Sequence, residues 1–217
     1  MFWKGGQDVP KISPERTNAR KDEIVNVCAS LYETMNFRDI TIKEIGGLTS
    51  CKRAAIYNYF QTKEEIFLAL HQREYEAWTA DLEAILETHN TLTADELAQE
   101  FAHSLERRER LLKLLSMNHY DMEANSRPER LVEFKRAYGN SMRAVARCLE
   151  KFRPAMTAEE KQDFLYAFFP FIYGIYPYTA VTEKQREAMK AAEVNYVYLS
   201  VYEMVYACVR KLLGVKE

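Results

Sequence analysis

The sequence predicts an all-α protein with a small N-terminal three-helix domain followed by a larger helical domain. Only seven glycines and six prolines interrupt 217 residues, too few for the frequent turns of a β-sandwich or barrel. The long stretches between them are rich in Glu, Lys, Arg, Leu, Ala and Met, which favour helix. Ser/Thr-x-x-Glu/Gln patterns also recur where apolar residues begin to repeat every three or four positions, as at helix N-termini.

These capping patterns predict where the helices begin. A first helix starts near Ser13-Pro14, because proline suits the first turn, and a short helix follows Cys51. Together with the six patterns this gives at least eight helices, and a break near residues 108–110 would give nine. The patterns are Thr41-x-x-Glu44, Thr62-x-x-Glu65, Thr93-x-x-Glu96, Ser126-x-x-Glu129, Thr157-x-x-Glu160 and Thr182-x-x-Gln185.

The N-terminal domain is expected to cover residues 13–61. Residues 1–12 lack the apolar stretch of a secretory signal and are expected to form a flexible lead-in. The second helix runs from Thr41 to about Leu48, and the third covers residues 52–60. The first helix should turn one apolar face inward, formed by Ile24, Val27, Cys28, Leu31 and Met35.

The second domain is expected to cover residues 62–217. Its first helix runs from Lys63 to about Leu86 without a Gly/Ser/Pro linker, so the joint between the domains should be rigid. The last helix should stop at Gly214. Residues 164–181 are 18 uncharged residues, but prolines and a glycine interrupt them, so a buried, kinked helix is expected rather than a membrane span.

The net charge, the cysteines and the absence of catalytic motifs limit the classes of function that the sequence supports. A net charge of −2 means that any nucleic-acid surface must be a local patch. The four cysteines are far apart and lie in apolar helical patterns, which indicates buried free thiols in a reducing cytoplasm. The sequence contains no nucleophile elbow, P-loop, dinucleotide fingerprint or zinc-protease motif and no spaced metal-ligand set. We therefore expect no enzyme activity, no cofactor and no metal.

The most informative segment spans residues 40–67, ITIKEIGGLTSCKRAAIYNYFQTKEEIF. It combines a Thr-capped helix, the pair Ile45-Gly46, the run Ile56-Tyr57-x-Tyr59-Phe60 and the Lys-containing start Thr62-Lys63-Glu64-Glu65. With these features the chain resembles, over about residues 20–70, the helix-turn-helix domain of TetR-family transcription regulators. It departs from the family pattern at the turn, where Ser50 replaces the usual glycine and Lys52 the usual capping serine. A positive φ at Ser50 would be strained.

The charges of this segment agree with a DNA-binding surface. No acidic residue lies between Glu44 and Glu64, while Lys52, Arg53 and Lys63 do, which provides a local attraction for phosphates. On the third helix, Arg53, Ala54 and Tyr57 share a face separate from the inward Ile56 and Phe60. Arg53 is predicted to contact a base edge, preferably guanine, with Ala54 in close approach and Tyr57 on base or phosphate. The predicted phosphate contacts are Thr41, Lys43, Lys52, Tyr59 and Lys63.

The resemblance implies two further surfaces in the second domain. TetR-family proteins dimerise through their last two helices, and here the candidates are Phe164, Phe171, Tyr198, Val201, Tyr202, Val205 and Val209. An inducer pocket is expected among the middle helices, with the candidates Met117, His119, Tyr120, Phe134, Tyr138, Met142, Phe168 and Tyr173. The competing interpretation for both sets is ordinary core packing.

The sequence therefore predicts a cytoplasmic homodimer that regulates transcription, as a repressor that an unknown small-molecule inducer releases from double-stranded operator DNA. The alternative is a helical module that binds a partner protein or lipid and carries the helix-turn-helix only by resemblance. DNA binding is favoured if the Arg53 and Tyr57 side chains are exposed on a convex surface and repeated by a two-fold axis at about 34–36 Å or a multiple of it, and the DNA-binding interpretation fails if both are buried. Activation instead of repression is a variant of the first interpretation.

Overall fold

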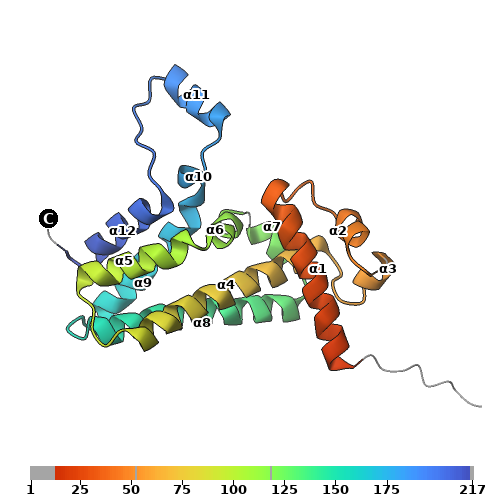
Figure 1. The fold of residues 1–217 in the computed structure, drawn as a ribbon, viewed down its shortest axis with the longest axis horizontal. Helices are drawn as coiled ribbons and strands as arrows, with labels where there is room; N and C mark the ends of the chain where they lie inside the picture. Colours follow the sequence, from red (N-terminus) through yellow and green to blue (C-terminus); the bar gives the residue numbers. More distant parts are fainter. Residues whose placement is uncertain (1–12, 52, 118, 216–217) are drawn as a thin grey trace, which may run out of the picture. The chain divides into compact units, whose positions relative to one another are not determined.

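The protein is all-helical over the residues that the computed structural model describes, 13–51, 53–117 and 119–215 (Figure 1). This confirms the predicted fold class. The expected lead-in, residues 1–12, lies outside these ranges, as does Lys52. The helices are α1 (Pro14–Thr34), α2 (Ile42–Leu48), α3 (Arg53–Ile56), α4 (Lys63–Thr88), α5 (Ala94–Glu106), α6 (Glu109–Leu115), α7 (His119–Ala124), α8 (Pro128–Phe152), α9 (Ala158–Gly174), α10 (Tyr176–Thr179), α11 (Glu183–Ala191) and α12 (Val201–Leu212).

The contacts of the chain group into two compact units that divide inside α4, between Leu70 and His71. The division lies C-terminal to the boundary expected between residues 61 and 62. The first unit contains α1 to α3 and the first turns of α4, and the second contains the remaining helices. Because α4 runs without interruption from Lys63 to Thr88, one helix contributes to both units.

The predicted N-terminal caps mark five helix starts correctly. Thr41, Thr62 and Thr182 each accept a hydrogen bond from the backbone N–H three residues on, at 3.3, 3.2 and 3.3 Å respectively. The helices α5 and α9 begin with complete reciprocal capping boxes. The prediction at Ser126 was wrong: Arg127 precedes α8, because Pro128 occupies the first turn and favours an extended residue before it. A box formed by Ser200 and Glu203 starts α12 and was not predicted.

In the first unit, α1 is rotated relative to the predicted inward face. Its buried residues are Ile24, Val25, Cys28, Ala29 and Tyr32. The Tyr32 ring meets Phe67 of α4 edge-on, with 5.2 Å between ring centroids, and this contact turns α1 toward the start of α4. Val27, Leu31 and Met35, which were expected inside, are half-buried, and the first two line a surface groove with Leu48.

The core of the second unit is built around Trp78 of α4. This side chain is fully buried, and its indole N–H donates to the Ser104 hydroxyl at 3.0 Å. Phe168 and Phe169 of α9 lie 6.5 and 5.9 Å from its ring centroid. α9 contains Pro170 and contributes Phe164, Phe168, Phe169 and Ile172 to the core. The buried helix expected over residues 164–181 is correct only as far as Gly174, because α9 ends there and no residue of the following α10 is buried. In the part of the chain that the structure describes, no helix is long and apolar enough to cross a membrane.

Residues 176–200, which we call the arm, contain α10, α11 and the connection to α12. The arm begins with α10, which contacts α6 and α9, and α11 then extends away from the other helices of the second unit (Figure 1). None of the residues of α11 is buried. Two contacts join parts of the arm to each other: Tyr178 meets Tyr196 at 6.5 Å between centroids, and the Arg186 guanidinium lies 4.4 Å from the Tyr198 ring centroid.

Candidate nucleic-acid interface and candidate ligand sites

Two buried isoleucines hold α2 and α3 together. Ile45 of α2 and Ile56 of α3 are both fully buried, as their positions in the sequence predicted. Gly46 lies where the helices approach most closely, because a Cβ built there would meet the Cα and Cβ of Arg53 and the Cδ1 of Ile56, each at 3.4 Å. A small residue at this position therefore fixes how Arg53 is presented.

Glu23 of α1 holds the turn between α2 and α3. Its carboxylate accepts the Ser50 backbone N–H at 2.5 Å and the Ser50 hydroxyl at 2.9 Å, and it pairs with Arg20 at 2.8 Å. These bonds, the Ser50 backbone bond foremost, lower the pKa of Glu23. Ser50 is not in the left-handed region, since Glu193 is the one described non-glycine residue with positive φ. The expected strain at Ser50 is therefore absent.

The third helix is shorter than predicted. Regular α-helix covers Arg53–Ile56, and the chain then continues in turns as far as Phe60. There the N–H groups of Asn58 and Tyr59 donate to the carbonyls of Ala55 and Ile56, three residues back, at 3.2 and 2.8 Å. Such tighter turns are common at helix ends. The rotation of the chain still carries Tyr57 onto the exposed side and Phe60 into the core.

The structure places Arg53, Ala54 and Tyr57 together on an exposed surface, which we call the reading surface. Arg53 and Ala54 are exposed, and Tyr57 retains 44% of its accessible area. Ile56 and Phe60, which alternate with them in sequence, are 0% and 1% exposed. One side of the segment is thus anchored in the core while the other presents a guanidinium, a methyl and a phenol to solvent.

The predicted phosphate-contacting residues are arranged less uniformly. Thr41 and Lys43 are exposed at the start of α2, and Tyr59 is half-buried. The Lys63 ammonium donates to the carbonyls of Phe37 and Ile40 at 2.8 and 3.2 Å. It therefore braces the connection between α1 and α2, and a phosphate contact from Lys63 would have to use its third N–H.

An aromatic cluster in the second unit brings together three of the predicted pocket residues. Phe134 and Tyr138 of α8 and Tyr173 of α9 surround Tyr75 of α4, whose hydroxyl lies 3.1 Å from that of Tyr173. Burial raises the pKa of the Tyr75 hydroxyl well above its ordinary value, so it stays protonated at neutral pH. His71 stacks on Tyr75 with 5.1 Å between centroids. Sequence reasoning missed Tyr75 and His71, although their four-residue spacing puts them on one face of α4.

The other predicted pocket residues lie apart from this cluster or at its edge. Phe168 packs against Phe101 in the core, with 5.8 Å between centroids, and Met142 and Met117 are half-buried. Tyr120 on α7 is 84% exposed. The side chain of His119 lies outside the described part of the chain.

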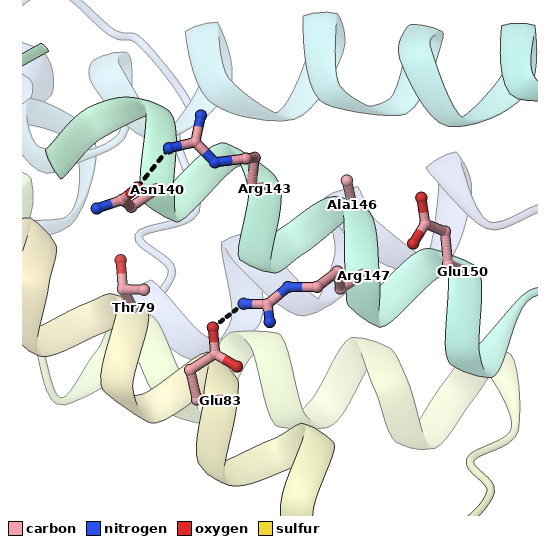
Figure 2. A pocket seen from close by; sticks show the side chains of 7 residues that line it. All are labelled: Thr79, Glu83, Asn140, Arg143, Ala146, Arg147 and Glu150. Carbon is pink, nitrogen blue, oxygen red and sulfur yellow. Dashed lines mark hydrogen bonds and ion pairs between the residues drawn. The ribbon is translucent and has the colours of Figure 1, made fainter. Parts of the chain in front are cut away.

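A separate groove of about 640 Å³ runs between α4 and α8 (Figure 2). It contains none of the predicted pocket residues. An ion pair between Glu83 of α4 and Arg147 of α8 crosses it, and Arg143 is hydrogen-bonded to Asn140. The residues that line it are Thr79, Glu83, Asn140, Arg143, Ala146, Arg147 and Glu150.

The predicted dimer residues divide into core and surface positions. Phe164, Val205 and Val209 are at most 2% exposed in the single chain, so they pack within one subunit and the prediction of a partner contact for them was wrong. Val205 and Val209 are buried because α12 lies along α5, where the Tyr206 hydroxyl donates to Asp95 at 2.8 Å and Arg210 pairs with it at 2.9 Å. Phe164 of α9 packs against Phe101 of α5, with 6.3 Å between ring centroids. Phe171, Val201 and Tyr202 are half-buried, as is Tyr198, which belongs to the arm.

Comparison with known proteins places the second unit in a family. A family model described as the tetracyclin repressor-like C-terminal domain matches residues 72–210. No curated protein matches the sequence.

Solved structures with the same fold cover nearly the whole chain. The fatty acid degradation regulator FadR from Bacillus halodurans has a TM-score of 0.57 at 13% identity, covering 90% of this chain and 99% of its own. Thermus thermophilus FadR, a TetR-family transcriptional repressor in complex with lauroyl-CoA, has 0.56 at 16%, covering 91% and 96%. A Mesorhizobium loti protein assigned to the TetR-family transcriptional regulators has 0.56 at 17%, covering 92% and 98%.

Proposed function

Because the chain belongs to the tetracyclin repressor-like (TetR) family of transcriptional regulators, we propose that it is a repressor that binds operator DNA and is released by a small molecule. The observation that carries the DNA-binding part is the reading surface. Its side chains are exposed while the alternating residues Ile56 and Phe60 are buried. Burial of Arg53 and Tyr57 would have favoured the alternative, a helical protein- or lipid-binding module that has the helix-turn-helix only by resemblance.

Each residue of the surface is suited to a particular contact with DNA. The Arg53 guanidinium, at the N-terminus of α3, matches the two acceptors of a guanine edge in the major groove. The Ala54 methyl permits close approach to the bases, and Tyr57 reaches a base or a phosphate. Thr41, Lys43, Lys52 and Tyr59 provide phosphate contacts that set the register of the protein without reading sequence.

A single helix-turn-helix reads few base pairs, so we propose a homodimer on a two-fold operator. The faces of α9 and α12 that this subunit leaves uncovered are suited to the contact. Tyr166 of α9 is 65% exposed, and Pro170, one turn further, is also exposed. On α12, Ala207 is exposed and Cys208 is half-buried. These positions replace the core residues Phe164, Val205 and Val209 as candidate partner contacts.

We propose that α4 transmits the effector signal. The helix carries Lys63 and Phe67 in the first unit and Tyr75 and Glu83 in the second. An effector that changes the inclination of α4 would change the separation of the two reading surfaces of a dimer. A coupling of about 1–3 kcal/mol per ligand is enough to alter operator occupancy substantially.

The test is binding of the purified protein to DNA from immediately upstream of its own gene, measured across a salt series. We expect saturable, sequence-selective binding that weakens as salt rises. Arg53→Ala should lose about 1–3 kcal/mol of binding free energy at one position of the site and relax its sequence preference there. The control is Arg136→Ala, an exposed arginine on α8, which should bind like the wild type.

Two results would contradict the proposal. One is a folded wild-type protein that binds no DNA flanking its gene; this would favour the protein- or lipid-binding alternative. The other is equal weakening by Arg53→Ala and Arg136→Ala, which would mean that the protein binds DNA only through its overall charge distribution.

A further inference from the structure

The groove between α4 and α8 is a candidate ligand site distinct from the aromatic cluster. Its volume of about 640 Å³ lies within the range of about 300–1,000 Å³ found for small-molecule sites. Ala146, whose side chain is a single methyl, also lines the groove and lies on α8 between Arg143 and Glu150 (Figure 2). The polar groups of this groove therefore determine which ligand it suits.

Two arginines of α8 face the groove from successive turns. Arg143 and Arg147 are four residues apart, so they lie on one side of the helix with their Cα atoms about 6 Å apart. Arg147 pairs with Glu83 across the groove. Arg143 donates to the Asn140 amide oxygen and has no carboxylate partner among the described residues. The groove thus contains one guanidinium whose charge is not neutralised and a second whose partner lies on the opposite helix.

We propose that this groove binds a phosphorylated small molecule, whose phosphate is held between Arg143 and Arg147. Guanidinium groups bind phosphate through paired N–H···O bonds, and a phosphate ester has enough oxygens to engage two of them at once. A carboxylate has two oxygens and a single negative charge, which one arginine already neutralises. Glu150, one turn beyond Ala146 on α8, also lines the groove, so the part of the ligand that lies beside it is neutral or cationic.

Binding in this position would compete with an interaction between the two helices. The phosphate takes Arg147 from Glu83, which removes an ion pair between α8 and α4. Because α4 reaches the first unit, loss of the pair alters how α4 is held. This regulatory consequence rests on the proposed function, whereas ligand binding itself does not.

The binding test is isothermal titration calorimetry of the full-length protein with phenyl phosphate, and with benzoate as the carboxylate probe. We expect saturable binding of phenyl phosphate and weaker binding of benzoate. Arg143→Gln and Arg147→Gln should each weaken binding about ten- to hundredfold. Glu83→Gln should tighten it about two- to fivefold, because the competing carboxylate is removed; a variant that merely unfolds cannot show such a gain. Arg136→Gln, on the same helix outside the groove, should match the wild type.

Several outcomes would overturn the site. For the wild type, these are no saturable binding of phenyl phosphate, or binding of benzoate that is as tight or tighter. For the variants, they are equal losses of phenyl phosphate affinity in Arg136→Gln and Arg143→Gln, or an unchanged or lower affinity in Glu83→Gln. Loss in Arg53→Ala would assign the phosphate to the reading surface instead. If the groove binds phenyl phosphate but operator affinity is unchanged, the regulatory consequence fails and the site stands. Failure of the ligand-free protein to bind DNA is a separate result, which concerns the proposed function.

Discussion

The neighbouring helices α11 and α12 have nearly the same signals at their ends and very different surroundings. Thr182 caps α11 and Ser200 caps α12, each through its side chain. Each helix ends with a backbone hydrogen bond from an N–H to the carbonyl five residues back: Val194 donates to Met189, and Val215 donates to Arg210, each at 3.0 Å. The residue before each donor, Glu193 or Gly214, has a positive φ. Yet α12 contains fully buried residues and α11 none.

The difference comes from the faces of the helices, not from their ends. Val205 and Val209 lie one turn apart and fill the side of α12 that packs along α5, and Tyr206 and Arg210 bind Asp95 beside them. The sequence of α11, EKQREAMKA, has no comparable stripe of large apolar residues. Caps decide where a helix begins and ends, but its apolar face decides whether it joins the core. The four predictions below test this distinction, in order of their expected effect on global unfolding.

The largest effect should come from the apolar face of α12. Val205→Ala removes two buried methyl groups and should lower the free energy of unfolding by about 2 kcal/mol. The matched variant Val197→Ala, at a residue of the arm that is 74% exposed, should change it by less than about 0.5 kcal/mol. Urea titration followed by circular dichroism measures both. Equal losses would show that the arm contributes to the cooperative core.

A smaller effect is expected at the N-terminal caps. Ser200→Ala removes the two hydrogen bonds that the Ser200 hydroxyl makes with the backbone N–H and the carboxylate of Glu203, while the Ser200 backbone N–H still donates to that carboxylate. It should lower the free energy of unfolding by about 1 kcal/mol. Thr182→Ala removes the corresponding cap of α11, and should fray that helix while leaving the urea midpoint unchanged, because no residue of α11 is buried. A shift of the midpoint by Thr182→Ala as large as that by Ser200→Ala would contradict the comparison.

A pH-dependent effect is expected where α12 meets α5. The Tyr206 hydroxyl, with help from Gln99 and Arg210, lowers the pKa of Asp95 below its usual 3.8. A carboxylate whose folded pKa is depressed contributes stability above its unfolded pKa, and that stability is lost as pH falls through the folded value. Tyr206→Phe should therefore be less stable than the wild type at pH 7, with the difference shrinking as the pH falls below 3.8 and through the lowered pKa of Asp95.

The measurement is the urea midpoint at several pH values, with Tyr178→Phe as the control. Tyr178 lies in the arm and is 54% exposed, so this variant should leave the pH dependence unchanged. If the difference between Tyr206→Phe and the wild type stays constant from neutral to acid pH, the tyrosine does not act through ionised Asp95.

Much of the fold could be predicted because its signals are local. Thr93 and Thr157 each specify a cap within four residues of sequence, and the structure contains both boxes. The spacing of Arg53, Ile56 and Tyr57 likewise predicted which of these side chains are exposed and which is buried. Ser126 failed for an equally local reason, since Pro128 moved the cap to Arg127.

The features that the sequence did not predict depend on contacts between residues distant in sequence, or on charged residues whose local pattern is that of any exposed helix. The turn at Ser50 is held by Glu23, 27 residues earlier, and no local pattern links them. Phe134, Tyr138 and Tyr173 were recognised as aromatic residues of the middle helices, but their contact with Tyr75 required knowing how α4, α8 and α9 pack. In the sequence, Arg143 and Arg147 have the spacing of ordinary solvent-exposed residues on one helix face. Their role in a groove depends on the position of Glu83 on α4, which the sequence does not give.

The smallest effect on global unfolding, and the most local, should come from the C-terminal end of α11. Glu193 has φ 54° where α12 has Gly214 at φ 69°, and a residue with a Cβ is disfavoured in this region by about 1–2 kcal/mol. Glu193→Gly should relieve that cost where it arises and slow amide hydrogen exchange in the last turn of α11. The urea midpoint should stay the same, because no residue of α11 is buried and its opening should not require the core to unfold. A raised midpoint would mean that α11 unfolds together with α12, and that the arm is packed as firmly as the helix that follows it.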